Sequence, residues 1–417
     1  MQEVGTEDIA AGDTTTAGHR YRWVVFFAMV GVYVAFGITM SSIPPMITEV
    51  RQDLGIGRGA MGLALGAWTF LYIFTASAAG SVVDRIGIRW SLFFGGLSLV
   101  LSGWARSFAE GTVSLWFSVA IMGLGGPLIS AAAPTLCGQW FTQKRERETA
   151  VSTYNLGPGI GSLATIFLTN SVLLPWLGDW RTVVRFESAI ALGLLLIWAV
   201  VAIRAPEAPA PPPVRAKVSM MQTRMELLRS ADVRDMLVLG ALTFFVGHSM
   251  GNWIVDAVAT RANLSDEQSA NWITGAGITG MLLLFVLPRL VDRFGRSNLL
   301  TASWTAVILG LFLIGVGSPR LVIVGVFVAA GRSVLVALMI MSVMAASGVN
   351  ASNMGAANGL WFAAAQVGAV IGPPLVGVIA DSAAGFGGAM FLLMAVGAVA
   401  IVVIQLRVRS STSSGTA

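Results

Sequence analysis

The sequence predicts an all-α membrane protein in which twelve transmembrane helices form two bundles of six. Composition is the first reason. Of 417 residues, 55% are hydrophobic and 11% are charged, which is about half the charge of a soluble domain. The second reason is that the charges lie between long apolar segments, each with the roughly 20 residues that cross a bilayer. Lipid requires such spans to be helical, because their backbone groups must hydrogen-bond internally.

The segments follow one another with short polar connections over most of the chain. We predict them at 23–43, 59–83, 89–108, 112–138, 150–175, 182–203, 235–259, 268–290, 298–317, 321–346, 354–380 and 386–406.

Residues 1–19 are predicted to be a disordered tail, and residues 410–417 a second short tail. The N-terminal stretch is polar and acidic, without the basic start and short apolar core of a secretory signal. Of the 26 Lys and Arg residues, 18 lie on the side of the membrane that holds both tails. The positive-inside rule therefore predicts cytoplasmic termini in a cell (inner) membrane. This placement also explains the net charge of +5 without a nucleic-acid partner.

A charged turn occurs twice, which is the third reason for the fold class. It reads GSVVDRIGIR at residues 80–89 and PRLVDRFGR at 288–296, so that Asp292 lies 208 positions after Asp84. Asp179 and Asp381 close two further segments, and each third segment therefore ends at an aspartate. The pattern predicts four three-helix units, alternately inverted, as in many transporters.

The longest connection, residues 204–234, divides the chain into bundles at 20–203 and 235–409. It begins with the proline-rich stretch APEAPAPPPVR, which favours an extended backbone. Met221, Met225 and Leu228 then share one helical face, and we expect a short interfacial helix there.

These features resemble the major facilitator superfamily over residues 20–409. The resemblance rests on the twelve spans, the division into six and six, and the G-x-x-x-D-R-x-G-x-R turn. It implies two bundles that rock about a central site lined by segments 1, 4, 7 and 10. The repeated turn can latch the cytoplasmic side when the cavity faces outward, or it can simply mark topology. The residues of this predicted latch are Gly80, Asp84, Arg85, Gly87 and Arg89, with Asp292, Arg293, Gly295 and Arg296 in the copy.

Segment 5 contains YNLGPGIGS, and segment 11 contains VGAVIGPPLVG. The first is similar to the glycine–proline motif of drug/proton antiporters in this superfamily. Because both halves have a version of it, we favour hinge and close-packing sites. The hinge residues are Gly157, Pro158 and Gly161 in segment 5, with Gly372 and Pro373 in segment 11.

Arg332 is the charge nearest the middle of a predicted span. An arginine there requires a carboxylate, a backbone partner or an anionic ligand; the alternative is a fixed ion pair between the bundles. Gly331 lies 208 positions after Gly123, so Arg332 replaces Leu124 of the equivalent helix. This break in the repeat favours a role in substrate binding.

Segment 7 places His248, Asn252 and Asp256 four residues apart on one side of a helix. His248 can exchange a proton near neutral pH, and Asp256 can do so when it is desolvated. We therefore assign proton coupling to these two residues. The alternatives are an inter-helix hydrogen bond for His248, and an ion pair of Asp256 with Arg261 or Arg51.

The remaining substrate-contact candidates are uncharged, and packing is the alternative role for each. They are Tyr33, Trp116, Trp253, Asn358, Trp361 and Gln366.

The sequence predicts a secondary active transporter that is a monomer and moves a small monovalent organic anion together with a proton. It is similar to the monocarboxylate and cyanate permease branches of the superfamily. The alternatives are a proton-driven exporter of drug-like or hydrophobic compounds and a non-transporting membrane sensor. We expect no enzyme activity, cofactor or metal, since no Walker loop or clustered metal ligands occur.

Overall fold

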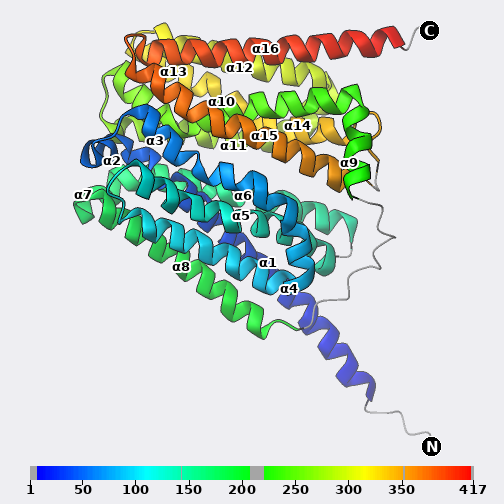
Figure 1. The fold of residues 1–417 in the computed structure, drawn as a ribbon. Helices are drawn as coiled ribbons and strands as arrows, with labels where there is room; N and C mark the ends of the chain where they lie inside the picture. Colours follow the sequence, from blue (N-terminus) through cyan, green and yellow to red (C-terminus); the bar gives the residue numbers. More distant parts are fainter. Residues whose placement is uncertain (1–6, 142, 207–219, 351–352, 415–417) are drawn as a thin grey trace, which may run out of the picture.

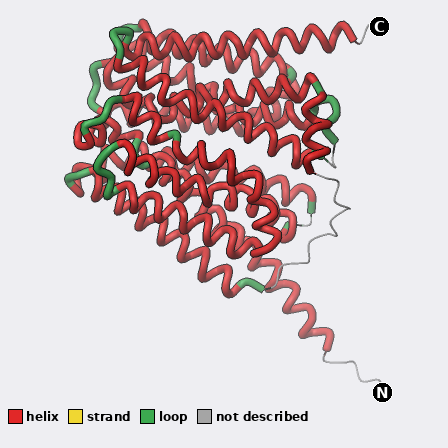
Figure 2. The backbone as a smooth tube through the Cα atoms, in the orientation of Figure 1, coloured by secondary structure: helices red, strands yellow, loops and turns green. Residues whose placement is uncertain are grey.

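The computed structural model describes residues 7–141, 143–206, 220–350 and 353–414, and all regular elements in these ranges are helices (Figures 1 and 2). Residues 1–6, 207–219 and 415–417, for which the sequence predicts tails and a proline-rich linker, lie outside the described residues. The all-helical architecture confirms the predicted fold class.

The chain forms two helical bundles that lie side by side (Figure 1). The N-terminal bundle contains α1 (Glu7–Ser41), η1 (Pro44–Met46), α2 (Ile47–Leu54), α3 (Arg58–Leu65), α4 (Ala67–Arg106), α5 (Thr112–Trp140), α6 (Lys144–Leu168), η2 (Thr169–Leu173), α7 (Leu174–Leu177) and α8 (Trp180–Arg204). The C-terminal bundle contains α10 (Ala231–Ala262), α11 (Asp266–Phe294), α12 (Arg296–Val316), α13 (Pro319–Ala329), η3 (Ala330–Val334), α14 (Leu335–Met344), α15 (Met354–Asp381) and α16 (Gly385–Ser414).

Eleven stretches of the described chain are long and apolar enough to cross a membrane. One of them, Arg58–Arg106, has 49 residues and contains predicted segments 2 and 3. Gly87 separates these two segments with a φ of 78°, and Gly295 separates α11 from α12 with a φ of 77°. The duplicated turn thus repeats in the backbone, in a conformation that glycine adopts readily.

The helices extend beyond the predicted spans at both ends of the chain. Residues 7–19, expected in the disordered tail, are the first turns of α1, and α16 continues to Ser414. In the linker, α9 covers Met220–Arg229, where the sequence predicts a helix.

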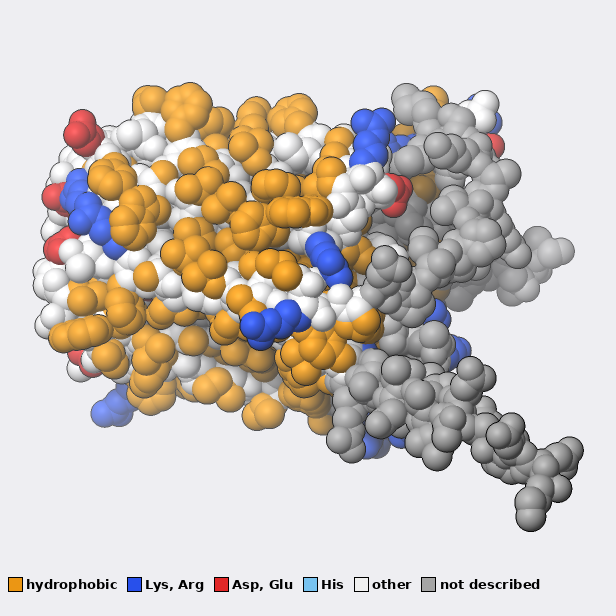
Figure 3. Space-filling model, turned by 90° about the horizontal axis from the view of Figure 1, so that it is seen from below, with side chains coloured by type: hydrophobic (Ala, Val, Ile, Leu, Met, Phe, Trp, Pro, Cys, Tyr) orange, Lys and Arg blue, Asp and Glu red, His pale blue; other side chains and the backbone are white. Residues whose placement is uncertain are grey.

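We call the end of the molecule with α9 and the last turns of α16 the linker end, and the end with α2, α3 and α7 the far end (Figure 1). Between these ends the surface is largely apolar. Figure 3 shows this for one face, on which hydrophobic side chains cover the middle and acidic side chains lie toward the ends. This distribution suits a protein that crosses a bilayer.

The glycine–proline motifs allow two helix pairs to approach very closely. A Cβ atom on Gly161 would lie 2.2 Å from the Val34 carbonyl oxygen of α1. A Cβ atom on Gly372 would lie 2.6 Å from the Phe245 carbonyl oxygen of α10. Gly157 lies against Tyr33 in the same way, and Pro158 lies against Gly37. Close packing of α6 on α1, and of α15 on α10, is therefore the structural role that these residues have here.

Candidate functional site

A cavity of about 360 Å³ lies between the two bundles, and we call it the central cavity. Residues of α1, α4 and α6 line it on one side, and residues of α10, α11, η3 and α14 line it on the other. No residue of α5 lines it within the described chain. Segment 4, expected at the site, is therefore absent from the lining, and segments 2, 5 and 8 contribute instead.

Arg332 lines this cavity on an interrupted helix. The 3₁₀ turn η3 (Ala330–Val334) separates α13 from α14, and mid-helix 3₁₀ turns often occur at functional hinges. Ser333, the next residue, packs against α11 where Gly280 leaves room: a Cβ on this glycine would lie 2.1 Å from the Ser333 Oγ. In the sequence, Gly331 is the only nearby residue that would indicate an interrupted helix.

The Arg332 guanidinium makes no hydrogen bond or ion pair with any residue that the structure describes. The described lining of the cavity also contains no Asp or Glu. A positive charge thus faces the cavity without an opposing carboxylate. An anion bound there would complete its interactions.

His248 and Asn252 line the same cavity from α10. His248 lies between two aromatic rings, with centroid distances of 5.6 Å to Trp68 and 5.3 Å to Phe244. Ser41 and Ser162 add hydroxyl groups from the other bundle. The cavity therefore combines one cation, an imidazole, an amide and hydroxyls with apolar walls.

Six of the predicted contact residues lie away from this cavity. Tyr33 is buried and donates to the Ile129 carbonyl at 3.4 Å, and Trp253 donates to the Pro373 carbonyl at 2.8 Å. Trp116 packs against Phe70 and Phe117 near the start of α5. Asn358, Trp361 and Gln366 belong to α15, and each has a buried side-chain atom without a hydrogen-bond partner. Here these aromatic and amide side chains fill helix interfaces. A hydropathy pattern cannot distinguish a residue that packs between helices from one that contacts substrate.

The far end is closed by an ionic cluster that joins the bundles. Arg58 of α3 forms two hydrogen bonds to Asp256 of α10, at 2.7 and 3.1 Å. It also pairs with Asp381 of α15 at 3.3 Å. Asp381 in turn accepts a hydrogen bond from the Arg58 backbone N–H at 2.6 Å, at the first turn of α3. We call Arg58, Asp256 and Asp381 the far-end gate.

This gate changes the interpretation of Asp256. Its side chain is 4% exposed, and its partner is Arg58 rather than the expected Arg261 or Arg51. Arg261 instead donates to the Ile314 carbonyl at 3.2 Å. Arg58 itself was missed, because it looks like one more loop arginine in the sequence. The only related signal in the sequence is that each third segment ends at an aspartate, and Asp381 is one of these.

The residues of the predicted latch lie at the linker end. Asp84, Arg85 and Asp292 are exposed and form no hydrogen bond or ion pair with another described residue. Arg89 and Arg296 donate to the carbonyls of Ala205 and Met341, each at 2.6 Å within its own half. Arg293 lies over the ring of its neighbour Phe294. These residues do not join the two bundles in this conformation.

Comparisons with known proteins place the chain in context. The family model described as Major Facilitator Superfamily matches residues 25–265 and 250–416. The chain is 28% identical to the D-galactonate transporter of Escherichia coli O6:H1, over 36% of this chain and 34% of that protein. It is 23% identical to the hexuronate transporter of Bacillus subtilis strain 168, over 82% and 84% of the two chains.

Solved structures share the fold. A bacterial homologue of the human lysosomal transporter Spinster, in an inward-facing and unoccupied conformation, superposes with a TM-score of 0.72. The two chains are 14% identical, and the match covers 92% of this chain and 95% of the homologue.

Proposed function

Because the chain belongs to the major facilitator superfamily and is a multi-pass membrane transporter rather than an enzyme, we propose that it imports a small monovalent organic anion together with a proton. Under this proposal it acts in the cell (inner) membrane as a monomer, by alternating access. The single observation that supports the anion most strongly is the Arg332 guanidinium, which faces the central cavity without a carboxylate.

A hydroxylated monocarboxylate fits the cavity best. A guanidinium and a carboxylate form two parallel hydrogen bonds, which fix orientation as well as charge. Asn252, Ser41 and Ser162 would then contact hydroxyl groups of the same molecule. The volume of 360 Å³ is within the usual range for small-molecule sites. The similarity to galactonate and hexuronate transporters supports the same substrate class.

The proposed orientation places the linker end in the cytoplasm, as the loop charges predict. The far end then faces outward and is closed by its gate, so that this conformation is inward-facing. Asp381 ends α15 and contacts the start of α3 in this conformation. Its counterpart in the inverted repeat is Asp84, which ends predicted segment 2, the segment that begins at α3. In the reverse conformation Asp84 would contact the start of α15 and act as the linker-end latch.

Proton coupling is proposed at Asp256, because the gate makes its protonation and the conformation mutually dependent. Arg58 and Asp256 belong to different bundles, so opening the far end must separate them. A buried carboxylate that loses its cation is favoured to take up a proton. Closing the gate returns Arg58 and favours proton release. His248, which lies in the cavity, is the proposed acceptor toward the inside.

The test is uptake of radiolabelled D-galactonate, D-gluconate and L-lactate into proteoliposomes, with D-galactose as the neutral control. Arg332→Gln should reduce uptake of the transported acid about a hundredfold, whereas Arg332→Lys should retain a measurable fraction. Arg320→Gln, which removes an exposed arginine at the start of α13, is the matched control. Unchanged acid uptake by Arg332→Gln would reject the anion site.

The same vesicles test proton coupling and the alternative exporter. Uptake should rise with an inward proton gradient and fall with a protonophore, and Asp256→Asn should remove that dependence. Efflux of a drug-like cation, with no response to any acid, would instead favour the exporter.

A further inference from the structure

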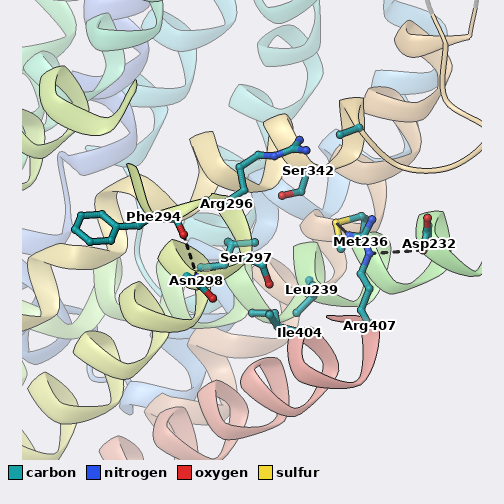
Figure 4. A pocket seen from close by; sticks show the side chains of 13 residues that line it. Asp232, Met236, Leu239, Phe294, Arg296, Ser297, Asn298, Ser342, Ile404 and Arg407 are labelled. Atoms are coloured by element: carbon teal, nitrogen blue, oxygen red, sulfur yellow. Dashed lines mark hydrogen bonds and ion pairs between the residues drawn. The ribbon is translucent and has the colours of Figure 1, made fainter. Parts of the chain in front are cut away.

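A second cavity lies inside the C-terminal bundle at the linker end (Figure 4) and shares none of its described lining residues with the central one. Its volume is about 470 Å³. The first turns of α10 and α12 and the last turns of α14 and α16 surround it. Arg296 of α12 and Arg407 of α16 both line it.

Positive charge exceeds negative charge in this pocket. Asp232 is the one acidic residue in its described lining. That carboxylate is already engaged by the Ser347 hydroxyl at 2.6 Å, the Ser347 backbone N–H at 3.1 Å and Arg407 at 3.6 Å. Arg296 donates to the Met341 carbonyl at 2.6 Å, which satisfies one N–H group but leaves the positive charge uncompensated. Two arginines and one aspartate give the lining a net charge of +1.

The uncharged lining divides into two kinds. Ser297, Asn298 and Ser342 provide polar groups beside Arg296, and Leu239 and Ile404 provide apolar surface near Arg407 (Figure 4). A ligand with an anionic headgroup and an apolar or carbon-rich tail would match this combination. Arginine and hydroxyl groups are the usual ligands of phosphate oxygens in proteins.

We propose that this pocket binds a phosphate ester, which is either the headgroup of an anionic phospholipid or a soluble organic phosphate. Both sources present the same anionic group to Arg296 and Arg407. The site is separate from transport through the central cavity and does not depend on which substrate that cavity takes. A bound phosphate would join α12 and α16 at the linker end.

The experiment measures thermal unfolding of the purified full-length protein. One arm adds phosphatidylglycerol, with phosphatidylcholine as its control, and the other arm adds glycerol 3-phosphate, with glycerol as its control. Binding raises the midpoint of unfolding in a concentration-dependent way. We expect a rise in one arm and an apparent affinity that is about tenfold weaker in the Arg296→Gln, Arg407→Gln double variant.

Two further variants protect the test against loss of folding. Ala345→Trp fills the exposed rim of the pocket and keeps both arginines, so it should also weaken the apparent affinity. Arg293→Gln removes an exposed arginine three residues from Arg296 that does not line the pocket, and it should leave the rise unchanged. The absence of a rise in both arms, or an equal rise in the pocket variants and Arg293→Gln, would overturn the proposal.

Discussion

The far end and the linker end contain related aspartates in opposite situations. At the far end Asp381 accepts a backbone hydrogen bond at the start of α3 and pairs with Arg58, which also engages Asp256. At the linker end Asp84 is exposed and has no partner among the described residues. In this conformation one aspartate of the inverted repeat is engaged and its counterpart is not, and we predict the reverse when the far end opens.

The largest effect is expected from Arg58→Ala, which leaves Asp256 buried without its cation. Removing one partner of a buried ion pair costs about 3 kcal/mol or more, and here the cost falls on the closed far end alone. We expect the distance between spin labels at Gln52 and Glu267, exposed on α2 and α11, to shift to longer values. The native Cys137 is buried and should not be labelled. An unchanged distance distribution would show that Arg58 does not hold this end closed.

Asp381→Asn should shift the label distance in the same direction as Arg58→Ala, but by a smaller amount. The substitution removes the ion pair with Arg58 and weakens the contact to the first turn of α3, while the Arg58–Asp256 pair remains. Loss of a helix-capping carboxylate costs about 1 kcal/mol. The same label pair should report a modest increase in the open population. An effect that equals that of Arg58→Ala would mean that Asp256 contributes little.

Arg51→Gln serves as a control for Arg58→Ala, because it also removes an arginine at the far end but should have little effect. Its contact with Asp381 is 3.8 Å long, and the Asp381 side chain is 35% exposed. A long contact to a partly exposed carboxylate contributes roughly 0.3 kcal/mol. The label distances should therefore stay close to those of the unsubstituted protein. A large opening would place Arg51 within the gate.

Asp84→Asn is expected to act in the opposite direction, with an effect that is small, like that of Arg51→Gln. Asp84 contributes no polar contact to this conformation, so its loss weakens only the conformation in which it would meet α15. A carboxylate near a helix N-terminus contributes about 0.5 kcal/mol. The closed population of the far end should rise slightly. An increase in far-end opening would contradict the proposed reciprocity.

The sequence predicted the fold well because hydropathy is a property of single segments. The twelve apolar segments, the mid-chain division and the duplicated turn all depend on residues close together in the chain. Arg332, His248 and Asn252, which the sequence proposes as substrate contacts, line one cavity; that they bind substrate stays a prediction.

The far-end gate could not be predicted because its partners are distant in the chain. Arg58 and Asp256 are 198 positions apart, and Arg58 and Asp381 are 323 apart. Nothing local distinguishes Arg58 from Arg51, seven residues earlier. The aromatic and amide candidates do not line the cavity for a related reason; Trp253, for example, donates to the Pro373 carbonyl of α15 instead. Amino-acid composition predicts that such a side chain is buried, but not whether it lies against a neighbouring helix or in a cavity.

The 3₁₀ turn at Ala330–Val334 also sets the rotation of the helix that follows it. A 3₁₀ turn advances about 120° per residue and an α-helix about 100°. Five residues therefore rotate α14 by roughly 100° relative to a continuous helix, and lengthen segment 10 by about 2.5 Å. The equivalent α5 is continuous through Leu124. Arg332 is the third residue of this turn, so rewinding the turn would rotate it by roughly 60° relative to α13. Local helical winding therefore affects where this charge points.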